Sequence, residues 1–426
     1  MSKGLQYEKL DPYVFVTKLA GFEHTKHIQG VATHQPESDT DVPMVQGKNI
    51  RNGFFVQEHE WFISKDVSDA LPRSVLDKPC ILIPYVGSNL GEVGIFPNGY
   101  RCHLASNIAK VELISEKYIL EYLKYYLQSD IGQGYLFQSK QGSAQPNITM
   151  ESIRNTLIIE RSQPEQQKIC DVLSTVDQKF LLNQKICTEL ETMAKTLYEY
   201  WFTQFDFPNA VGKPYRSSGG EMVWNDQLKR EIPKVWDSGT INSLMKIENT
   251  SVNPQKLGNT VMEHYSIPAF DIDHNPAYEK ANTIESGKYA VDSECILTSK
   301  LNPHFKRLWD PYCDTKNAIC STEFIVYRPK TAWTRPFCYA VLNSDAFYAH
   351  MSGKATASTG SRKRIQPDVS ASFELAIPDE KTMRSFVDLY APIMEKQKAL
   401  YKENRELTKL RDWLLPMLMN GQATVE

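Results

Sequence analysis

Apolar residues recur at alternating steps of three and four along the segment that follows Pro164. Ser162 and Glu165 have the spacing of a capping box, and Pro164 suits the first turn of a helix, where its missing N–H matters little. We therefore predict one long helix over 162–207, whose narrow apolar stripe suits packing against a single partner helix. The stripe consists of Ile169, Val172, Val176, Ile186, Leu190, Met193, Leu197 and Tyr200, with Lys179 and Asn183 interrupting it.

The same stripe returns in register at an offset of 217 positions, starting at Phe386. It predicts a second long helix over 379–426, with Pro392 as a kink or as the true start and Asn420-Gly421 as a C-cap. Two matching stripes of this kind predict that the two helices pair with each other. The apolar members of the second stripe are Phe386, Leu389, Ile393, Leu400, Leu407, Leu410, Leu414 and Met417.

The chain is organised as a tandem in which a globular segment precedes a long helix twice: 1–161, 162–207, 208–378 and 379–426. A polar glycine-serine turn leads into each helix. Short β-rich runs at 80–84, 92–96, 294–298 and 323–327, with a short helix over 115–128, indicate an α+β fold with mixed globular segments. Outside the helices and turns the two halves show no residue-level match, so we expect a duplicated frame carrying two different heads.

The composition is that of an ordinary folded protein, with 41% hydrophobic and 23% charged residues among 426. The net charge of −3 gives no overall footprint for a polyanion, so a local patch or a basic partner subunit would have to contact phosphates. No apolar run is long enough to span a membrane and no signal peptide is visible, so we expect a cytoplasmic protein. The eight scattered cysteines are typical of isolated thiols in a reducing compartment.

The motifs of common catalytic sites are absent from the sequence. It contains no G-x-x-x-x-G-K-[ST] loop, no G-x-S-x-G elbow and no H-E-x-x-H helix. The glycines of VGSNLGEVG (from Val86) lack dinucleotide-binding spacing and indicate a turn. DPYC (from Asp310) lacks the second proline of an adenine-methyltransferase motif. His24 and His27 have no third ligand nearby, so we predict neither a metal site nor a catalytic site.

Three stretches carry a resemblance to a known family: the run from GSAQPNITMESIRN (Gly142) to ELETMAKTLYEYWFTQFDF, GGEMVWNDQLKREIPKVW (Gly219 to Trp236), and ENRELTKLRDWLLPMLMNGQATV (Glu403 to Val425). They resemble the central conserved region, the entry to the second recognition domain and the C-terminal conserved helix of specificity subunits of Type I restriction–modification enzymes. GEVGIFPNGYRCHLASN and LNPHFKRLWDP also resemble the framework of their recognition domains.

The resemblance implies two target-recognition domains separated by two long antiparallel, coiled-coil-like helices in a pseudo-twofold tandem repeat. Each domain would read one half of a bipartite, asymmetric double-stranded DNA target. The helices would carry two modification (methyltransferase) subunits, which restriction (translocase) subunits can join. S-adenosylmethionine, ATP and Mg²⁺ are then expected on those partners, with no cofactor and no catalysis in this chain.

Four polar loops are equipped for DNA, because Arg and Lys neutralise phosphate or read guanine, and Asn and Gln pair with the adenine edge. In the first globular segment we predict contacts from Lys48, Asn49, Arg51, Lys140, Gln141 and Gln145. In the second we predict contacts from Lys300, Lys306, Arg307, Arg362, Lys363, Arg364 and Gln366.

Two other classes of function stay open at this point. A coiled-coil scaffold whose heads bind proteins would show no sequence-selective DNA binding even with its partners present. A hydrolase with a Cys–His site would need a thiol of depressed pKa beside a histidine, and Cys102-His103 is the only adjacent pair.

Overall fold

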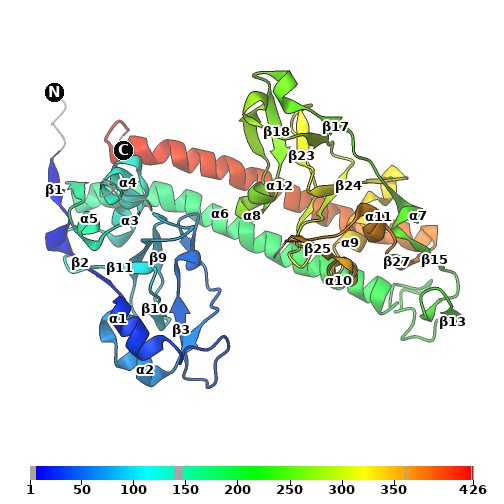
Figure 1. Cartoon of the computed structure of the whole chain (residues 1–426), viewed down its shortest axis with the longest axis horizontal. Helices are drawn as coiled ribbons and strands as arrows, with labels where there is room; N and C mark the ends of the chain where they lie inside the picture. Colours follow the sequence, from blue (N-terminus) through cyan, green and yellow to red (C-terminus); the bar gives the residue numbers. More distant parts are fainter. Residues whose placement is uncertain (1–5, 139–146, 360–361, 424, 426) are drawn as a thin grey trace. The chain divides into compact units, whose positions relative to one another are not determined.

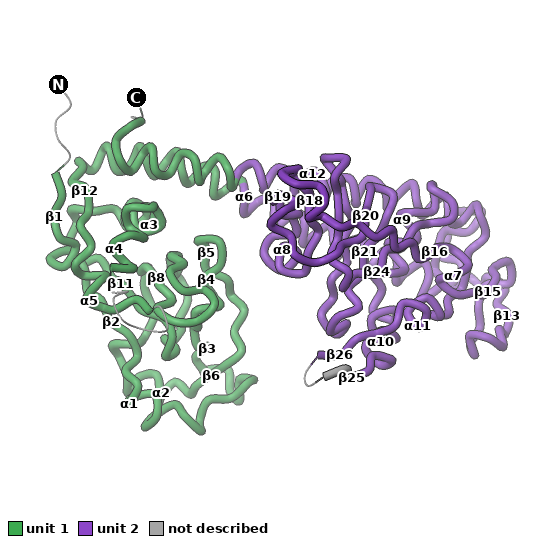
Figure 2. The backbone as a smooth tube through the Cα atoms, turned by 45° about the horizontal axis from the view of Figure 1, so that its top comes forward, with its two compact units in different colours: residues 1–179, 408–426 green, residues 180–407 purple. Residues whose placement is uncertain are grey.

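The computed structural model of the chain describes residues 6–138, 147–359, 362–423 and 425. They form two compact units, coloured separately in Figure 2: unit 1 contains 1–179 and 408–426, and unit 2 contains 180–407. Two long helices, α6 (Gln163–Tyr198) and α12 (Glu380–Met419), contribute to both units (Figure 1). None of the helices in the described part of the chain is both long enough and apolar enough to cross a lipid bilayer.

The first head, residues 6–159 of unit 1, is built on two four-stranded sheets in the orders β2-β11-β8-β9 and β6-β3-β10-β7. Side chains of β8 alternate between two cores: Ile81 and Ile83 face the core shared with α3 and α6, whereas Leu82 faces the core of the second sheet. Because both faces are covered, every residue of β8 is buried and apolar, which is the pattern that predicts this strand.

The strands of the first head are β1 (Tyr7–Lys9), β2 (Val14–Lys18), β3 (Val42–Val45), β4 (Ile50–Arg51), β5 (Phe54–Phe55), β6 (Phe62–Ile63), β7 (Val75–Leu76), β8 (Cys80–Pro84), β9 (Gly94–Phe96), β10 (Cys102–Leu104), β11 (Ile108–Leu113) and β12 (Leu157–Ile159). Its helices are α1 (Gly21–Glu23), α2 (Lys65–Asp69), α3 (Leu120–Gln128), α4 (Asp130–Leu136) and α5 (Met150–Arg154). The helix expected over 115–128 therefore begins later, at Leu120.

The second head, residues 237–377 of unit 2, contains a four-stranded sheet in the order β16-β24-β21-β22 and a five-stranded sheet in the order β17-β20-β23-β18-β19. Its strands are β15 (Asp237–Thr240), β16 (Met245–Ile247), β17 (Ser251–Val252), β18 (Val261–Tyr265), β19 (Ala277–Lys280), β20 (Lys288–Ala290), β21 (Ile296–Ser299), β22 (Leu308–Trp309), β23 (Ala318–Ser321), β24 (Phe324–Pro329), β25 (Thr356–Thr359), β26 (Arg362–Arg364) and β27 (Glu374–Ile377). Its helices are α7 (Ile241–Leu244), α8 (Ile267–Asp273), α9 (Arg335–Leu342), α10 (Asp345–Lys354) and α11 (Pro367–Ala371), and a hairpin of β13 (Met222–Asn225) and β14 (Arg230–Pro233) precedes the head.

The two heads have the same topology. The sheet β2-β11-β8-β9 corresponds strand for strand, in chain order and in sheet position, to β16-β24-β21-β22. The second sheets also correspond in four strands, down to one parallel pair in each, β3 with β10 and β18 with β23, while β17 is an additional strand of the second head. The sequence did not reveal this shared strand order, because the two heads have too little residue identity to show it.

A two-stranded antiparallel ribbon joins the two ends of each head. In the first head β1 pairs with β12, with Tyr7 opposite Ile159. In the second head β15 pairs with β27, with Asp237 opposite Ile377. Each ribbon stands directly before a long helix in the chain, so each head is entered and left at one place.

The ends of the long helices follow their local sequence. The Glu165 carboxylate accepts the Ser162 backbone N–H at 2.9 Å, as in a capping box, but the Ser162 hydroxyl also donates to this carboxylate at 2.6 Å. Pro392 lies inside α12, which begins at Glu380, so it does not mark the start of the helix. Gly421 has a φ of +76° just after the last turn of α12, as a C-cap requires.

Within each unit the two long helices run antiparallel. In unit 2, the Asn183 side-chain amide lies 2.9 Å from the Asn404 side-chain oxygen. Trp201, in the π-helical turn Glu199–Thr203 that follows α6, has its ring centre 5.7 Å from that of Phe386, which is earlier on α12 than Asn404. In unit 1, Ile169 at the start of α6 shares a hydrophobic core with Leu418 at the end of α12.

The buried stripe differs from the predicted one by one residue at every second position. The stripe on α6 is Ile169, Leu173, Val176, Phe180, Asn183, Cys187, Leu190, Ala194, Leu197 and Trp201, all buried or half-buried. At the same offset of 217, α12 buries Phe386, Tyr390, Ile393, Gln397, Leu400, Asn404, Leu407, Arg411, Leu414 and Leu418 fully or in part. The buried positions thus recur at this offset, but three predicted pairing residues are wrong: Met193, Leu389 and Leu410 are 60%, 52% and 42% exposed.

The heads decide which side of the helix is buried. Leu173 belongs to the core of the first head with Tyr122 of α3, and Trp201 belongs to the core of the second head with Phe337 of α9. A second apolar column, beside the buried stripe, is left uncovered to different degrees. We call it the outer column, and it consists of Ile186 and Met193 on α6, Tyr200 in the π-helical turn (Glu199–Thr203) that follows α6, and Leu389, Leu410 and Met417 on α12. Val172, at the corresponding position near the start of α6, packs against the core of the first head.

Candidate nucleic-acid interface

The only adjacent Cys–His pair lies in the interior of the first head. His103 is completely buried on β10, with Nδ1 3.2 Å from the Ser68 hydroxyl, and burial lowers its pKa to about 4. Burial raises the pKa of the Cys102 thiol to about 12. Both side chains are buried and successive side chains of a strand point to opposite faces, so this pair lacks the geometry of a Cys–His site. Among the described residues no group of three His, Cys, Asp or Glu side chains is placed to hold a metal ion.

Two basic segments that are far apart in the sequence form one surface on the second head. The loop that follows β21 and the β25–β26 hairpin are held together by backbone hydrogen bonds, from Asn302 N–H to the Lys363 carbonyl at 2.8 Å and from Ile365 N–H to the Lys300 carbonyl at 3.1 Å. The Asn302 side chain accepts the Lys363 N–H at 2.9 Å. We call this surface the basic platform. The structure therefore brings Lys300 together with Arg362 and Lys363.

The predicted DNA-contacting residues of the second head differ in exposure and in whether they pair with a carboxylate. The side chains of Arg362, Lys363 and Gln366 are exposed. Arg364 forms two hydrogen bonds with the Glu323 carboxylate, and Arg307 forms two with Asp271 at 2.7 and 2.8 Å.

The Lys306 side chain lies in a cavity and not on the exposed surface of the platform. Its ammonium group lies 5.6 Å from the centre of the Tyr348 ring, and it lines a cavity of about 190 Å³ against α6 and α12. Burial lowers its pKa. Arg362 and Lys363 are therefore the most exposed of the predicted cations of the second head.

In the first head the predicted loop is largely neutralised by its own carboxylates. Lys48 pairs with Glu60, and Arg51 pairs with Glu58 at 3.0 Å. Asn49 is 1% exposed, and its amide donates to two carbonyls of the same loop at 2.9 Å while its oxygen accepts the Gln46 N–H. The prediction that Asn49 contacts DNA is therefore wrong, because its hydrogen-bonding groups hold the loop together. Lys140, Gln141 and Gln145 lie outside the described residues.

The platform of the second head includes residues that the sequence did not single out. Asn302 adopts a φ of +46°, which Asn tolerates better than most residues and which turns the loop back toward the hairpin. This turn presents Phe305, which is 54% exposed, with the Arg307 guanidinium 5.1 Å from its ring centre. An exposed aromatic ring beside cations suits contact with bases or sugars. The signal was the Asn-Pro pair inside a basic run, a common mark of a turn.

Comparison with known proteins agrees with this architecture. Residues 30–192 match the family described as the Type I restriction modification DNA specificity domain. The Type I restriction enzyme MjaIX specificity subunit of Methanocaldococcus jannaschii is 25% identical over 403 residues, which cover 91% of this chain and 88% of that protein. The Type I restriction enzyme HindI specificity subunit of Haemophilus influenzae is 21% identical over 347 residues, covering 67% of this chain and 72% of that protein.

A solved structure supports the fold. The crystal structure of a Type-I restriction-modification system S subunit from M. genitalium covers 98% of this chain and 96% of its own, with a TM-score of 0.54 at 14% identity. The likeness extends over both heads and both long helices of the chain. Residues 30–192 of the chain are thus similar to the DNA specificity domain of Type I restriction–modification enzymes, and 91% of the chain is similar to a specificity subunit of that kind.

Proposed function

We propose that this chain reads a bipartite double-stranded DNA target, one half with each head, as the specificity subunit of a Type I restriction–modification complex. The observation that carries the proposal is the repeated strand order of the two heads, each followed by one of two long helices with the same buried stripe. A repeat of this kind supplies two similar reading surfaces in one polypeptide. Different loop residues on the two surfaces make the target asymmetric.

The long helices act as the spacer in this proposal. With 36 and 40 residues they are about 54 and 60 Å long at about 1.5 Å per residue. Antiparallel pairing would relate the two halves by a pseudo-twofold axis, which matches the local dyad of duplex DNA. The two half-sites should then be separated by a spacer that is fixed in length but free in sequence.

Two modification subunits are the partners that the helices would carry. The outer column supports this, because large apolar residues such as Met193 and Leu389 are exposed on the long helices. S-adenosylmethionine would be bound by those subunits, and ATP and Mg²⁺ by restriction subunits, so this chain would position the chemistry without performing it. The complex would act in the cytoplasm.

Methylation mapping tests the proposal directly. We expect co-expression of the chain with its modification subunit to methylate adenines in a two-part motif with a constant spacer. Replacing residues 237–377 by another head should change one half of the motif and preserve the other. A stable complex that produces no motif would instead favour the protein-binding scaffold.

A further inference from the structure

The repeated topology gives the basic platform of the second head a counterpart in the first. The platform loop connects β21 to β22, whose counterparts are β8 and β9, so its equivalent is the loop over 85–93. The platform hairpin stands between α10 and α11, and the matching position between α4 and α5 leads to Ile148. The first head should therefore carry a corresponding surface next to Tyr85, at the end of β8.

One backbone hydrogen bond identifies the correspondence independently of strand order. In the second head the N–H of Ile365 donates to the Lys300 carbonyl at 3.1 Å. In the first head the N–H of Ile148 donates to the Tyr85 carbonyl, also at 3.1 Å. Ile148 and Ile365 are separated by the same offset of 217 positions as the helical stripes. In both heads, therefore, the same backbone hydrogen bond joins the segment before the following short helix to the first residue of the loop after β8 or β21.

The 85–93 loop has a fixed base and an exposed tip. Gly91 N–H donates to the Pro84 carbonyl at 3.0 Å, and the Asn89 amide donates to the Ile50 carbonyl at 2.9 Å. Gly87 has a φ of +99°, which a residue with a side chain would rarely adopt, and it forms the turn. The tip residues Val86 and Ser88 are exposed. A rigid loop that holds its tip in solvent is suited to reading a partner surface.

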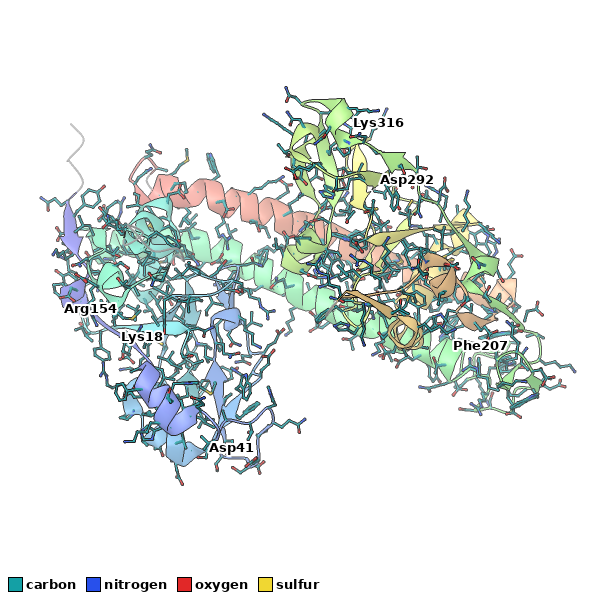
Figure 3. All side chains as sticks on the ribbon, viewed as in Figure 1. Lys18, Asp41, Arg154, Phe207, Asp292 and Lys316 are labelled. Carbon is teal, nitrogen blue, oxygen red and sulfur yellow. The ribbon has the colours of Figure 1, made fainter. Side chains whose placement is uncertain are left out.

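Lys18 provides the cation of this surface. It stands at the end of β2 (labelled in Figure 3), with its ammonium group 4.5 Å from the centre of the Tyr85 ring. The side chain is exposed and, within the described part of the chain, pairs with no carboxylate. Lys48 and Arg51, by contrast, are each neutralised by a glutamate. Binding phosphate through Lys18 would therefore break no existing ion pair.

We propose that the loop after β8, with Ser88 at its tip and Lys18 at its base, is the surface through which the first head contacts its half of the DNA target. The inference deepens the proposed function and rests on it. It moves the interface of this head away from residues 47–51, whose cations pair with Glu58 and Glu60. Lys18 contacts phosphate, and the loop tip faces the bases.

The test uses the full chain in complex with its modification subunit and a duplex carrying the mapped target. Affinity is measured by fluorescence anisotropy across a range of salt concentrations. We expect Lys18→Ala to weaken binding about fivefold and to reduce the slope of log affinity against log salt by about one, because one phosphate contact is lost. Lys9→Ala is the matched control, since Lys9 is also an exposed strand lysine but lies in the β1–β12 ribbon. It should leave both quantities unchanged.

A pair of opposite charges at the loop tip separates contact from damage to the fold. Ser88→Glu should weaken binding and Ser88→Arg should strengthen it, while both variants keep the melting temperature of the parent. A folding defect would move both affinities the same way. The mapped motif gives a second readout, since replacing residues 86–90 should alter only one half of it.

Two results would overturn the inference. If Lys18→Ala and both Ser88 variants bind like the parent while Lys48→Ala and Arg51→Ala lower the salt slope, the 47–51 loop is the interface and this inference alone fails. If the unmodified complex shows no sequence-selective binding to any duplex, the proposed function fails and the inference fails with it.

Discussion

His103 carries no charge in the folded first head at neutral pH, because its ring is completely buried and burial lowers its pKa to about 4. In the unfolded chain a histidine has a pKa near 6.5, so between about pH 6.5 and 4 the unfolded state binds more protons. The free energy of unfolding must therefore fall as the pH falls through this window. From pH 7 to pH 5 the loss from this group is about 2 kcal/mol, at about 1.4 kcal/mol per pH unit.

Substitution isolates this contribution. We expect the free energy of unfolding of His103→Gln, measured with urea, to fall less between pH 7 and pH 5 than that of the parent, by about 2 kcal/mol. His34→Gln serves as the control, because His34 is exposed in the same head. Equal pH dependence in the His103 variant and the parent would contradict a neutral buried ring.

At the same scale, Asn49 and Lys18 show which roles of single residues cannot be predicted from the sequence. Asn49 stands in a polar loop between two basic residues, and nothing local distinguishes a loop-bracing amide from a base-reading one; its three partners come from positions 46, 56 and 58. Lys18 ends a buried strand and attracts no attention until the fold places it over Tyr85. Both misjudgements concern contacts set by backbone geometry rather than by residue type.

At the scale of elements, the long helices were predictable and their contact face was not. Strand β8 was predictable because both of its faces are covered, which leaves an unbroken apolar run. Each long helix instead carries three neighbouring columns of apolar residues. The central column belongs to both the predicted and the buried stripe, and one further column lies on either side of it. The spacing of apolar positions in the sequence is equally compatible with burial of the column on either side. Only the packing of α3 and α9 against the helix buries Leu173 and Trp201 more deeply than Val172 and Tyr200.

A polar layer interrupts the paired helices of unit 2 and supports a prediction about register. Asn183 is fully buried and donates to the Asn404 side chain at 2.9 Å and to Glu403 at 2.8 Å. Buried asparagines in helix pairs fix register at some cost in stability. We expect Asn404→Leu to lower the free energy of unfolding by about 1–3 kcal/mol, because Asn183 loses a buried partner.

The double variant is the informative comparison. Asn183→Leu combined with Asn404→Leu should recover most of the loss in urea unfolding, since neither buried amide is then left unmatched. If the two losses simply add, the asparagines do not act as a pair. Leu182→Ala is a suitable control on α6, because Leu182 is 52% exposed.

At the scale of the whole molecule, we expect the outer column to contact the modification subunit. We expect Met193→Glu and Leu410→Glu each to weaken association with the modification subunit at least about tenfold, because a charge would be buried in an apolar contact. Both residues are exposed in the free chain, so the melting temperature should not change. Pull-down and calorimetric titration of the complex measure the effect.

The control for that experiment is Thr188→Glu, which adds the same charge to an exposed position on another face of α6. It should assemble like the parent. Normal assembly of both outer-column variants would mean that the partner sits elsewhere, and the exposed apolar residues would then lack the assigned role.

The two ribbons that close the heads have a consequence for how such chains diversify. Since β1 pairs with β12 and β15 with β27, each head begins and ends at neighbouring points, immediately before a helix. A genetic crossover in the ribbon and helix sequences would exchange a complete head, while the spacer and its partner surfaces passed unchanged to the recombinant. New specificity could then arise by inheritance of whole cassettes, without the gradual remodelling of a working interface.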